Sequence, residues 1–271
     1  MAQKIEHASF LYAKQLVGKT FMYVFDKRFI EVIYKKDNFL HFTGVDSKLS
    51  AGQFFKLAKQ GKLGASQFYF SPRHYFENAK KKVNNLSTLP ALATGESLMV
   101  EDVTTQTSKY KFGNTDLKLS VLFEKSQLGN NSNRDIYFGK SFRVDDCFNK
   151  SQNQYVITYI FSKPNDKKQY DTLLYKDKSA ILDDLPNQAI ALLSDEIKVL
   201  LSVENLNSEK DVSTSIKKTI TSRDSQVGQQ SPTLKKNRAS LDDRLKQARE
   251  TRDSQAPQEQ LRFKSNNRDD R

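Results

Sequence analysis

The feature that most constrains the fold is a series of short segments between Ser97 and Lys176, rich in aromatic and β-branched residues. They read SLMVEDV, KYKFG, LKLSVLFEK, RDIYFGKSF, QYVITYIFSK and DTLLYK, and Gly, Asn, Ser or Asp residues separate them. Residues of this kind favour strands, and connections this short join antiparallel neighbours. The sequence therefore predicts a substantial, mainly antiparallel sheet rather than a parallel, doubly wound one.

The remainder of the first 200 residues mixes helical and strand patterns. Apolar spacing predicts helices at Ile5–Val17, Ser50–Gly61 and Pro72–Leu89, and a closing helix at Asp183–Leu201. Two aromatic-rich segments, TFMYVF and FIEVIYKK, predict a hairpin, and Phe39–Phe42 is expected to continue the sheet. Because the first helices precede the main run of strands, we expect an α+β fold.

The composition changes near Asn205. Residues 207–271 hold 15 Lys and Arg against 10 Asp and Glu, with Phe263 as their only aromatic residue. Such a segment buries too little apolar surface to offset the entropy of ordering it. We therefore expect a folded domain over residues 1–204 and a charged, mostly disordered tail over residues 205–271. A narrow apolar stripe near residues 240–253 predicts a short helix, which either fluctuates in solvent or orders on a protein partner.

The formal net charge is +12, of which the tail carries +5. A positive excess of this size favours RNA or another nucleic acid as partner, although many lysine-rich proteins are basic without one. The single cysteine, Cys147, cannot form an internal disulfide, and no apolar run approaches the ~20 residues of a membrane helix. The N-terminus does not resemble a secretory signal. We expect a cytoplasmic protein that does not associate with membranes.

Several common chemistries lack their sequence patterns. The chain has no GxxxxGK[ST], no GxGxxG after a strand, no HExxH and no paired cysteines. The two carboxylates beside Cys147 also argue against a thiol nucleophile. We therefore expect neither a cofactor nor a bound metal ion.

Histidine is rare here, and only His7, His41 and His74 occur. His41 ends the predicted strand in NFLHFTGV, just before Gly44, where a rigid sheet can present a side chain to a cleft. The alternative is a structural histidine whose hydrogen bonds are made within the sheet edge. His7, near the N-terminus, and His74, at a helix start, are expected to have no role.

The segments KKDNFLHFTGV, QFFKLAKQGKL and KKKVNNL, together with RDIYFGKSFRVDD and YVITYIFSKPNDKKQYDTLLYK, carry a family resemblance. Over roughly residues 5–180 the chain resembles the fourth of the phage-borne nuclease families grouped with barnase, EndoU, the colicin ribonucleases and RelE. One departure is visible: the family pattern places a proline before Ser141, and Lys140 stands there instead. The resemblance implies the α+β fold of these nucleases.

The resemblance also implies metal-independent RNA cleavage, in which the ribose 2′-hydroxyl attacks the adjacent phosphate. Such chemistry needs proton transfer and stabilisation of phosphate charge. His41 is the expected acid–base residue, and Thr43 its hydrogen-bonding neighbour. The phosphate-side candidates are Lys80, Ser141 and Lys163, although the lysines could simply face water and Ser141 could cap the following turn. Further substrate contacts are expected from Lys36, Arg143 and Tyr170.

Six tyrosines are candidates for stacking on unpaired bases. They are Tyr34, Tyr69, Tyr137, Tyr159, Tyr170 and Tyr175. Most are expected to be buried, and the sequence does not distinguish which one faces a cleft.

Two other functions fit the same residues. A non-catalytic nucleic-acid-binding module would keep the basic charge and the salt-dependent binding. A mobile-element interaction protein would instead recruit its partner through the tail helix near residues 240–253.

Overall fold

The computed structural model describes residues 1–126, 135–145, 147–203 and 243–252. The chain divides into two compact units, Met1–Ser208 and Glu209–Arg271, and in the second unit residues 243–252 are helical. The expected domain boundary at residues 204–205, and most of the expected tail, lie outside the described residues. Within the described ranges, no helix has both the length and the apolar character needed to cross a membrane.

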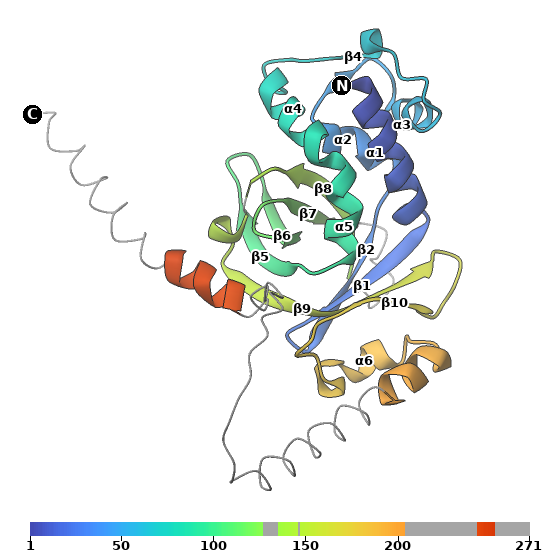
Figure 1. The fold of residues 1–271 in the computed structure, drawn as a ribbon, viewed down its shortest axis with the longest axis vertical. Coiled ribbons are helices and arrows are strands. Elements are labelled where there is room, and N and C mark those ends of the chain that lie inside the picture. Colours follow the sequence, from blue (N-terminus) through green and yellow to red (C-terminus); the bar gives the residue numbers. More distant parts are fainter. Residues whose placement is uncertain (127–134, 146, 204–242, 253–271) are drawn as a thin grey trace, which may run out of the picture. The chain divides into compact units, whose positions relative to one another are not determined.

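The first unit is built on an eight-stranded sheet with helices packed against it (Figure 1). The predicted hairpin and all six strands predicted between Ser97 and Lys176 are present, and the α+β class is confirmed. The strands are β1 (Lys19–Phe25), β2 (Arg28–Ile33), β5 (Leu98–Thr104), β6 (Lys109–Thr115), β7 (Ser120–Lys125), β8 (Ile136–Arg143), β9 (Asn153–Pro164) and β10 (Thr172–Lys176).

The strand pairings close into a ring. Starting from β1, the neighbours are β2, β8, β7, β6, β5 and β9, and β9 pairs back with β1. In the described chain these pairs are antiparallel except β2 with β8, which run parallel. The length of β9 makes closure possible, because its first residues pair with β5, whereas residues from Ile157 onward pair with β1. The tenth strand, β10, pairs with β9 outside the ring.

Strand β1 is buried on both faces. Phe21, Tyr23 and Phe25 belong to the larger apolar core, and Met22 and Val24 belong to a second one. This alternation follows from the two-residue period of a strand. The larger core is covered by helices near the N-terminus, and the second by residues 180–201; Figure 1 accordingly shows α1 and α6 on opposite sides of β1 and β9.

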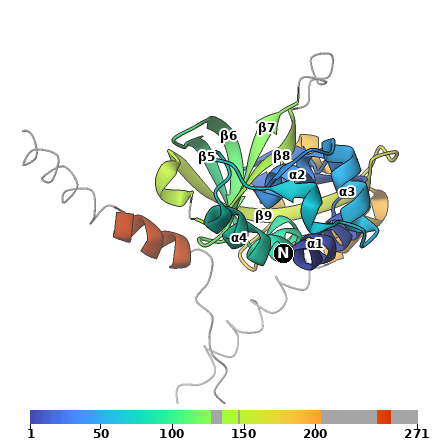
Figure 2. The same cartoon turned by 90° about the horizontal axis from the view of Figure 1, so that it is seen from above.

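Short helices and a small two-stranded sheet precede β5. The helices are α1 (Ala2–Gln15), α2 (Phe39–Thr43), α3 (Ala51–Lys59), α4 (Phe76–Asn85) and α5 (Leu89–Thr94), and the small sheet pairs β3 (Asp46–Ser47) with β4 (Phe68–Tyr69) in antiparallel orientation. Helix α3 begins with a capping box between Ser50 and Gln53, as the Ser start of the predicted helix indicated. Seen from above in Figure 2, α2 lies next to β8.

Three predicted elements were wrong in type or extent. Phe39–Phe42 is not a strand but part of helix α2. Phe39 and Phe42 are three residues apart, so a strand would point them to opposite faces, whereas a helix places both on its buried face. The helix predicted at Pro72–Leu89 begins only at Phe76, since Ser71 and His74 form a β-bridge. The closing helix is interrupted after α6 (Asn187–Ile190), because Leu192 and Ser194 form backbone hydrogen bonds with Tyr170.

Aromatic side chains from β1, β6, β7, β8 and β9 meet inside the ring. Tyr23 contacts Phe123 at a centroid distance of 5.9 Å, and Phe25 contacts Phe112 at 5.7 Å. Phe112 in turn lies 5.3 Å from Tyr137 in an edge-on arrangement. These large rings fill the space between the strands, which small side chains could not do.

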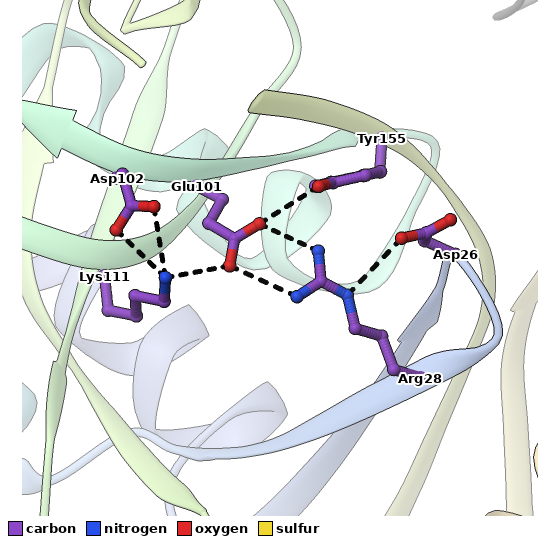
Figure 3. Close-up of polar contacts among 6 residues, drawn as sticks. All are labelled: Asp26, Arg28, Glu101, Asp102, Lys111 and Tyr155. Carbon is purple, nitrogen blue, oxygen red and sulfur yellow. Dashed lines mark hydrogen bonds and ion pairs between the residues drawn. The ribbon is translucent and has the colours of Figure 1, made fainter. Parts of the chain in front are cut away.

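A charged cluster lies over Phe25 and Phe112, and Figure 3 shows the polar contacts within it. The Arg28 guanidinium lies 4.9 Å from the Phe25 centroid and 4.7 Å from that of Tyr155. It donates two hydrogen bonds to Glu101, at 3.2 and 2.8 Å, while Lys111 lies 3.0 Å from the same carboxylate. Burial opposes ionisation of Glu101, but the hydrogen bonds from Arg28 and Lys111 prevail and lower its pKa to about 2.

We predict that Glu101→Gln lowers the free energy of unfolding at pH 7 by about 3 kcal/mol. Because the folded-state pKa is about 2 against an ordinary 4.5, the charged group stabilises the protein fully above about pH 4.5 and loses that effect as the pH falls toward 2. Urea unfolding at pH 7, 5 and 3 should therefore show a smaller difference between the two proteins at pH 3.

The matched control is Glu124→Gln, which also removes a strand carboxylate from an ion pair with lysine. Glu124 contacts Lys140 at 2.9 Å, but its side chain is 48% exposed, so the cost should stay below about 1 kcal/mol. Equal losses in the two variants would contradict the special role of Glu101.

Candidate active site

His41 lies on the exposed side of α2, whose buried residues Phe39, Phe42 and Thr43 hold the helix against the core. The helix ends at Gly44, which adopts the left-handed conformation with a φ of 70°. A side chain there would be strained, and a Cβ would also lie only 2.8 Å from Cδ of Lys82. Gly44 thus allows the Lys82 side chain to pack over the turn that follows His41.

The environment of His41 is basic. Partial burial lowers the pKa of its imidazole, and the nearby charges of Lys140, His74 and Lys82 lower it further, against a smaller opposite effect of Glu124. These groups come from β8, from the turn before α4, and from α4 itself. His41 is therefore neutral near pH 7, the state in which an imidazole accepts a proton.

His74 is held by an acidic partner. Its Nδ1 lies 2.7 Å from Oδ1 of Asp46, and the backbone of the turn is fixed by reciprocal hydrogen bonds between Ser71 and His74. A hydrogen bond from Ser71 and the contact with His74 lower the pKa of Asp46 despite its partial burial. No local pattern pointed to His74, because Asp46 lies 28 residues away and the two side chains meet only in the folded chain.

Lys82, rather than Lys80, is the lysine of α4 that reaches this region. Burial and the charge of Arg143 lower the pKa of Lys82 to about 8, although Asp145 acts in the opposite direction. Lys80 is exposed, and its Nζ lies 5.5 Å from the Phe76 ring centroid. The helical spacing of α4 could have identified Lys82 in the sequence, because Lys82 lies three residues after the buried Ala79 and beside the buried Val83.

Strand β8 contributes Lys140, Ser141 and Arg143. The register of its pairing with β7 shifts between Leu122 and Phe123, whose partners are Ser141 and Gly139. Lys140, between these two partners, has no opposite residue on β7 and forms a β-bulge. Bulges re-aim side chains next to active sites. Lys140 is thereby placed where its charge acts on His41.

Arg143 ends β8 beside an open pocket. Its Nε is buried and has no hydrogen-bond partner among the described residues, and its charge acts on Lys82. The pocket measures about 340 Å³ and is lined by Thr104, Thr105, Gln106, Thr107, Arg143, Asp145 and Lys150. A buried guanidinium nitrogen at its edge is suited to an anionic ligand such as phosphate.

The other expected site residues lie in different surroundings. Thr43 is buried, and its hydroxyl donates to the Leu40 carbonyl at 2.6 Å and accepts from the Val45 amide at 3.2 Å, so it holds the turn. Lys36 is exposed in the 3₁₀ turn before α2. Lys163 and Tyr170 are buried and contact each other, with Lys163 Nζ 4.9 Å from the Tyr170 centroid.

Lys163 and Tyr170 are separated from His41 by the sheet. Tyr170 belongs to the second apolar core, and Lys163 shares the strand face of Tyr159 and Phe161 in that core. Helix α2 instead packs its phenylalanines into the larger core on the other side of β1. The structure therefore brings His41, Lys140 and Arg143 together with Lys82 and His74, and leaves Lys163 and Tyr170 elsewhere.

The described residues contain no group of three or more His, Cys, Asp or Glu side chains arranged to hold a metal ion. Burial raises the pKa of the Cys147 thiol, which makes it a poor nucleophile. The basic side chains around His41 are suited to proton transfer and to binding a polyanion.

Comparison with known proteins identifies the family. Neither a curated protein nor a solved structure matches the chain. Residues 4–179 match the model of a family described as phage-Barnase-EndoU-ColicinE5/D-RelE like nuclease4, which confirms the resemblance seen in the sequence. The matched range runs from α1 through β10 and contains His41, His74, Lys82 and Arg143. Because it covers well over half of the sequence, the chain belongs to this family of phage nucleases.

Proposed function

We propose that the protein is a metal-independent endoribonuclease in which His41 and His74 transfer protons. The observation that carries the proposal is the convergence of His41, His74, Lys82 and Lys140 from four separate segments, close enough for their charges to act on the His41 imidazole. Two histidines in a basic site supply the base and the acid that cleavage of RNA through its 2′-hydroxyl requires.

In this mechanism the neutral His41 accepts the proton of the ribose 2′-hydroxyl as that oxygen attacks phosphorus. His74, oriented by Asp46 through Nδ1, gives a proton from Nε2 to the 5′-oxygen as the bond between phosphorus and that oxygen breaks. The products are a 2′,3′-cyclic phosphate and a free 5′-hydroxyl. Exchange of protons with water then restores both histidines.

Charge on the phosphate is stabilised by Lys82, Lys140 and Arg143. Lys82 packs over Gly44 and the Arg143 Nε is buried, so these two donors are held in place before the substrate binds, whereas Lys140 exchanges its ion pair with Glu124 for the phosphate. Ser141, beside Lys140, remains a proposed substrate contact, and so does Lys36 at the start of the α2 segment. Lys80, Lys163 and Tyr170 are not part of the mechanism that we propose. A cytoplasmic location, and a protein partner for residues 240–253, stay predictions.

We predict that His41→Ala and His74→Ala each reduce RNA cleavage in excess EDTA by about 10²- to 10⁴-fold, the contribution of a positioned acid or base. The assay is gel analysis of total RNA and of a defined oligonucleotide, with end-group identification of the cyclic phosphate.

His7→Ala is the matched control, because His7 is the third histidine and is exposed on α1. It should retain full activity. Full activity in either of the other two variants would remove that histidine from the mechanism. Intact RNA with the wild-type protein, despite salt-sensitive binding, would instead indicate a non-catalytic nucleic-acid-binding module.

We also predict that RNA binding weakens as the pH rises through about 8, where Lys82 loses its proton. Fluorescence anisotropy of a labelled oligonucleotide on the His41→Ala protein measures this without cleavage, from pH 7 to pH 9. Lys82→Arg should abolish this pH dependence, because arginine stays charged throughout the range. Lys80→Arg, on the exposed side of the same helix, should leave it unchanged; an unchanged profile in Lys82→Arg would contradict the assignment.

A further inference from the structure

Four exposed aromatic side chains occur within eight consecutive residues beside the candidate active site. Tyr69, Phe70, Tyr75 and Phe76 are 48%, 37%, 61% and 47% exposed, respectively. We call these four residues the aromatic platform. Exposing several large rings together is costly in water, so a cluster of this kind marks a binding surface.

The backbone holds the platform in place. Tyr69 pairs with Asp46 in the small sheet of β3 and β4, and the bridge between Ser71 and His74 fixes the turn that leads to Tyr75. Phe70 and Phe76 meet edge to face at 5.1 Å and 88°, and Phe68 lies 6.3 Å from Phe70 in a similar arrangement. Because Phe68, Phe70 and Phe76 support one another, ordering these rings on a ligand costs little additional entropy.

The charge around the platform is complementary to a polyanion. Along the sequence, residues 59–82 contain Lys59, Lys62, Arg73, Lys80, Lys81 and Lys82 against Glu77, a net charge of +5, and Asp46 opposite Tyr69 adds one further acid. Lys80 even lies over the Phe76 ring, with Nζ 5.5 Å from the centroid. Interleaved aromatic and basic side chains are the arrangement by which proteins bind single-stranded nucleic acid.

The platform is continuous with the proposed active site. Asp46, which pairs with Tyr69 through the backbone, holds His74 through its side chain. His74 itself lies between Phe70 and Tyr75 in the sequence. A base stacked on these rings would therefore belong to a nucleotide next to the phosphate that His74 and His41 approach.

We infer that the aromatic platform is a base-binding subsite, which stacks an unpaired base next to the scissile phosphate. In a duplex the bases are stacked on one another and their faces are closed to side chains. Single strands leave these faces open, and stacking tolerates any base. This inference rests on the proposed function, and its test is a binding measurement that needs no cleavage.

The experiment compares three proteins in the His41→Ala background: the parent, a double Tyr69→Leu/Tyr75→Leu variant, and a double Tyr69→Phe/Tyr75→Phe variant. Leucine keeps an apolar side chain without a π-face, whereas phenylalanine keeps the ring. The probes are a labelled single-stranded RNA and a blunt duplex of the same sequence. Thermal unfolding of each variant checks that the fold is unchanged.

We expect the leucine variant to lose single-strand affinity by roughly five- to 150-fold for each stacked base. Its duplex affinity should stay that of the parent, and the phenylalanine variant should bind like the parent throughout. Phe10→Leu is the matched control, since Phe10 is a 53% exposed aromatic on α1 outside the platform. It should leave both affinities unchanged.

Unchanged single-strand binding by the leucine variant, or equal losses for single strand and duplex, would overturn the inference while leaving the His41 mechanism intact. Conversely, selective loss of single-strand binding in a protein whose wild type cleaves no RNA would support the platform and refute the proposed activity. Sedimentation of the parent as a dimer that the leucine changes dissociate would show that a second copy of the chain occupies the platform, and would also overturn the inference.

Discussion

The structure depends on the burial of β1 on both faces and its pairing along both edges. One edge pairs with β2 and the other with β9, which closes the ring of strands. Its odd-numbered aromatic residues face the larger core and Met22 and Val24 face the second. Because neither side of β1 is left in water, the N-terminal helices and residues 180–201 are both anchored to the same strand.

The position of the candidate active site follows from this closure. The parallel pairing of β2 with β8 places β8 beside the chain that leaves β2 and enters α2. Gly139 makes the approach possible, since a Cβ there would lie 2.9 Å from Tyr34 and 3.1 Å from Phe42. With α2 packed against β8, His41 comes under the influence of Lys140 on the bulge.

The charged cluster around Arg28 and the basic group around His41 differ in how their surroundings act on the pKa values of their members. Around Arg28 each cation has a carboxylate partner, and the pKa of Glu101 is lowered as expected for a stabilised charge. Around His41, Lys140 and His74 also have carboxylate partners, but burial and like charge together lower the pKa values of His41 and Lys82. The first arrangement stabilises the fold. Lowered pKa values in one group of basic side chains are typical of functional sites, which is why we propose a function for the second.

Much of the fold could be predicted because the spacing of apolar residues that distinguishes strands from helices can be read from short segments of sequence. All the segments proposed as strands between Ser97 and Lys176 form strands, and the basic, aromatic-rich segments carried the family resemblance that residues 4–179 confirm. Local patterns failed where tertiary pairing decided the conformation. Phe39 and Phe42 suit a strand by composition, but their packing against the core requires a helix.

By itself, the sequence determined the α+β class, the family and the choice of His41 as the residue to test. Only the tertiary structure selected Lys82 over Lys80, joined His74 to Asp46, and separated Lys163 and Tyr170 from His41 by the thickness of the sheet. The physical reason is that the position of a residue within the repeat of its helix or strand specifies the face on which its side chain lies. Its partners across that face depend on strand register and ring closure, which join residues far apart in the sequence.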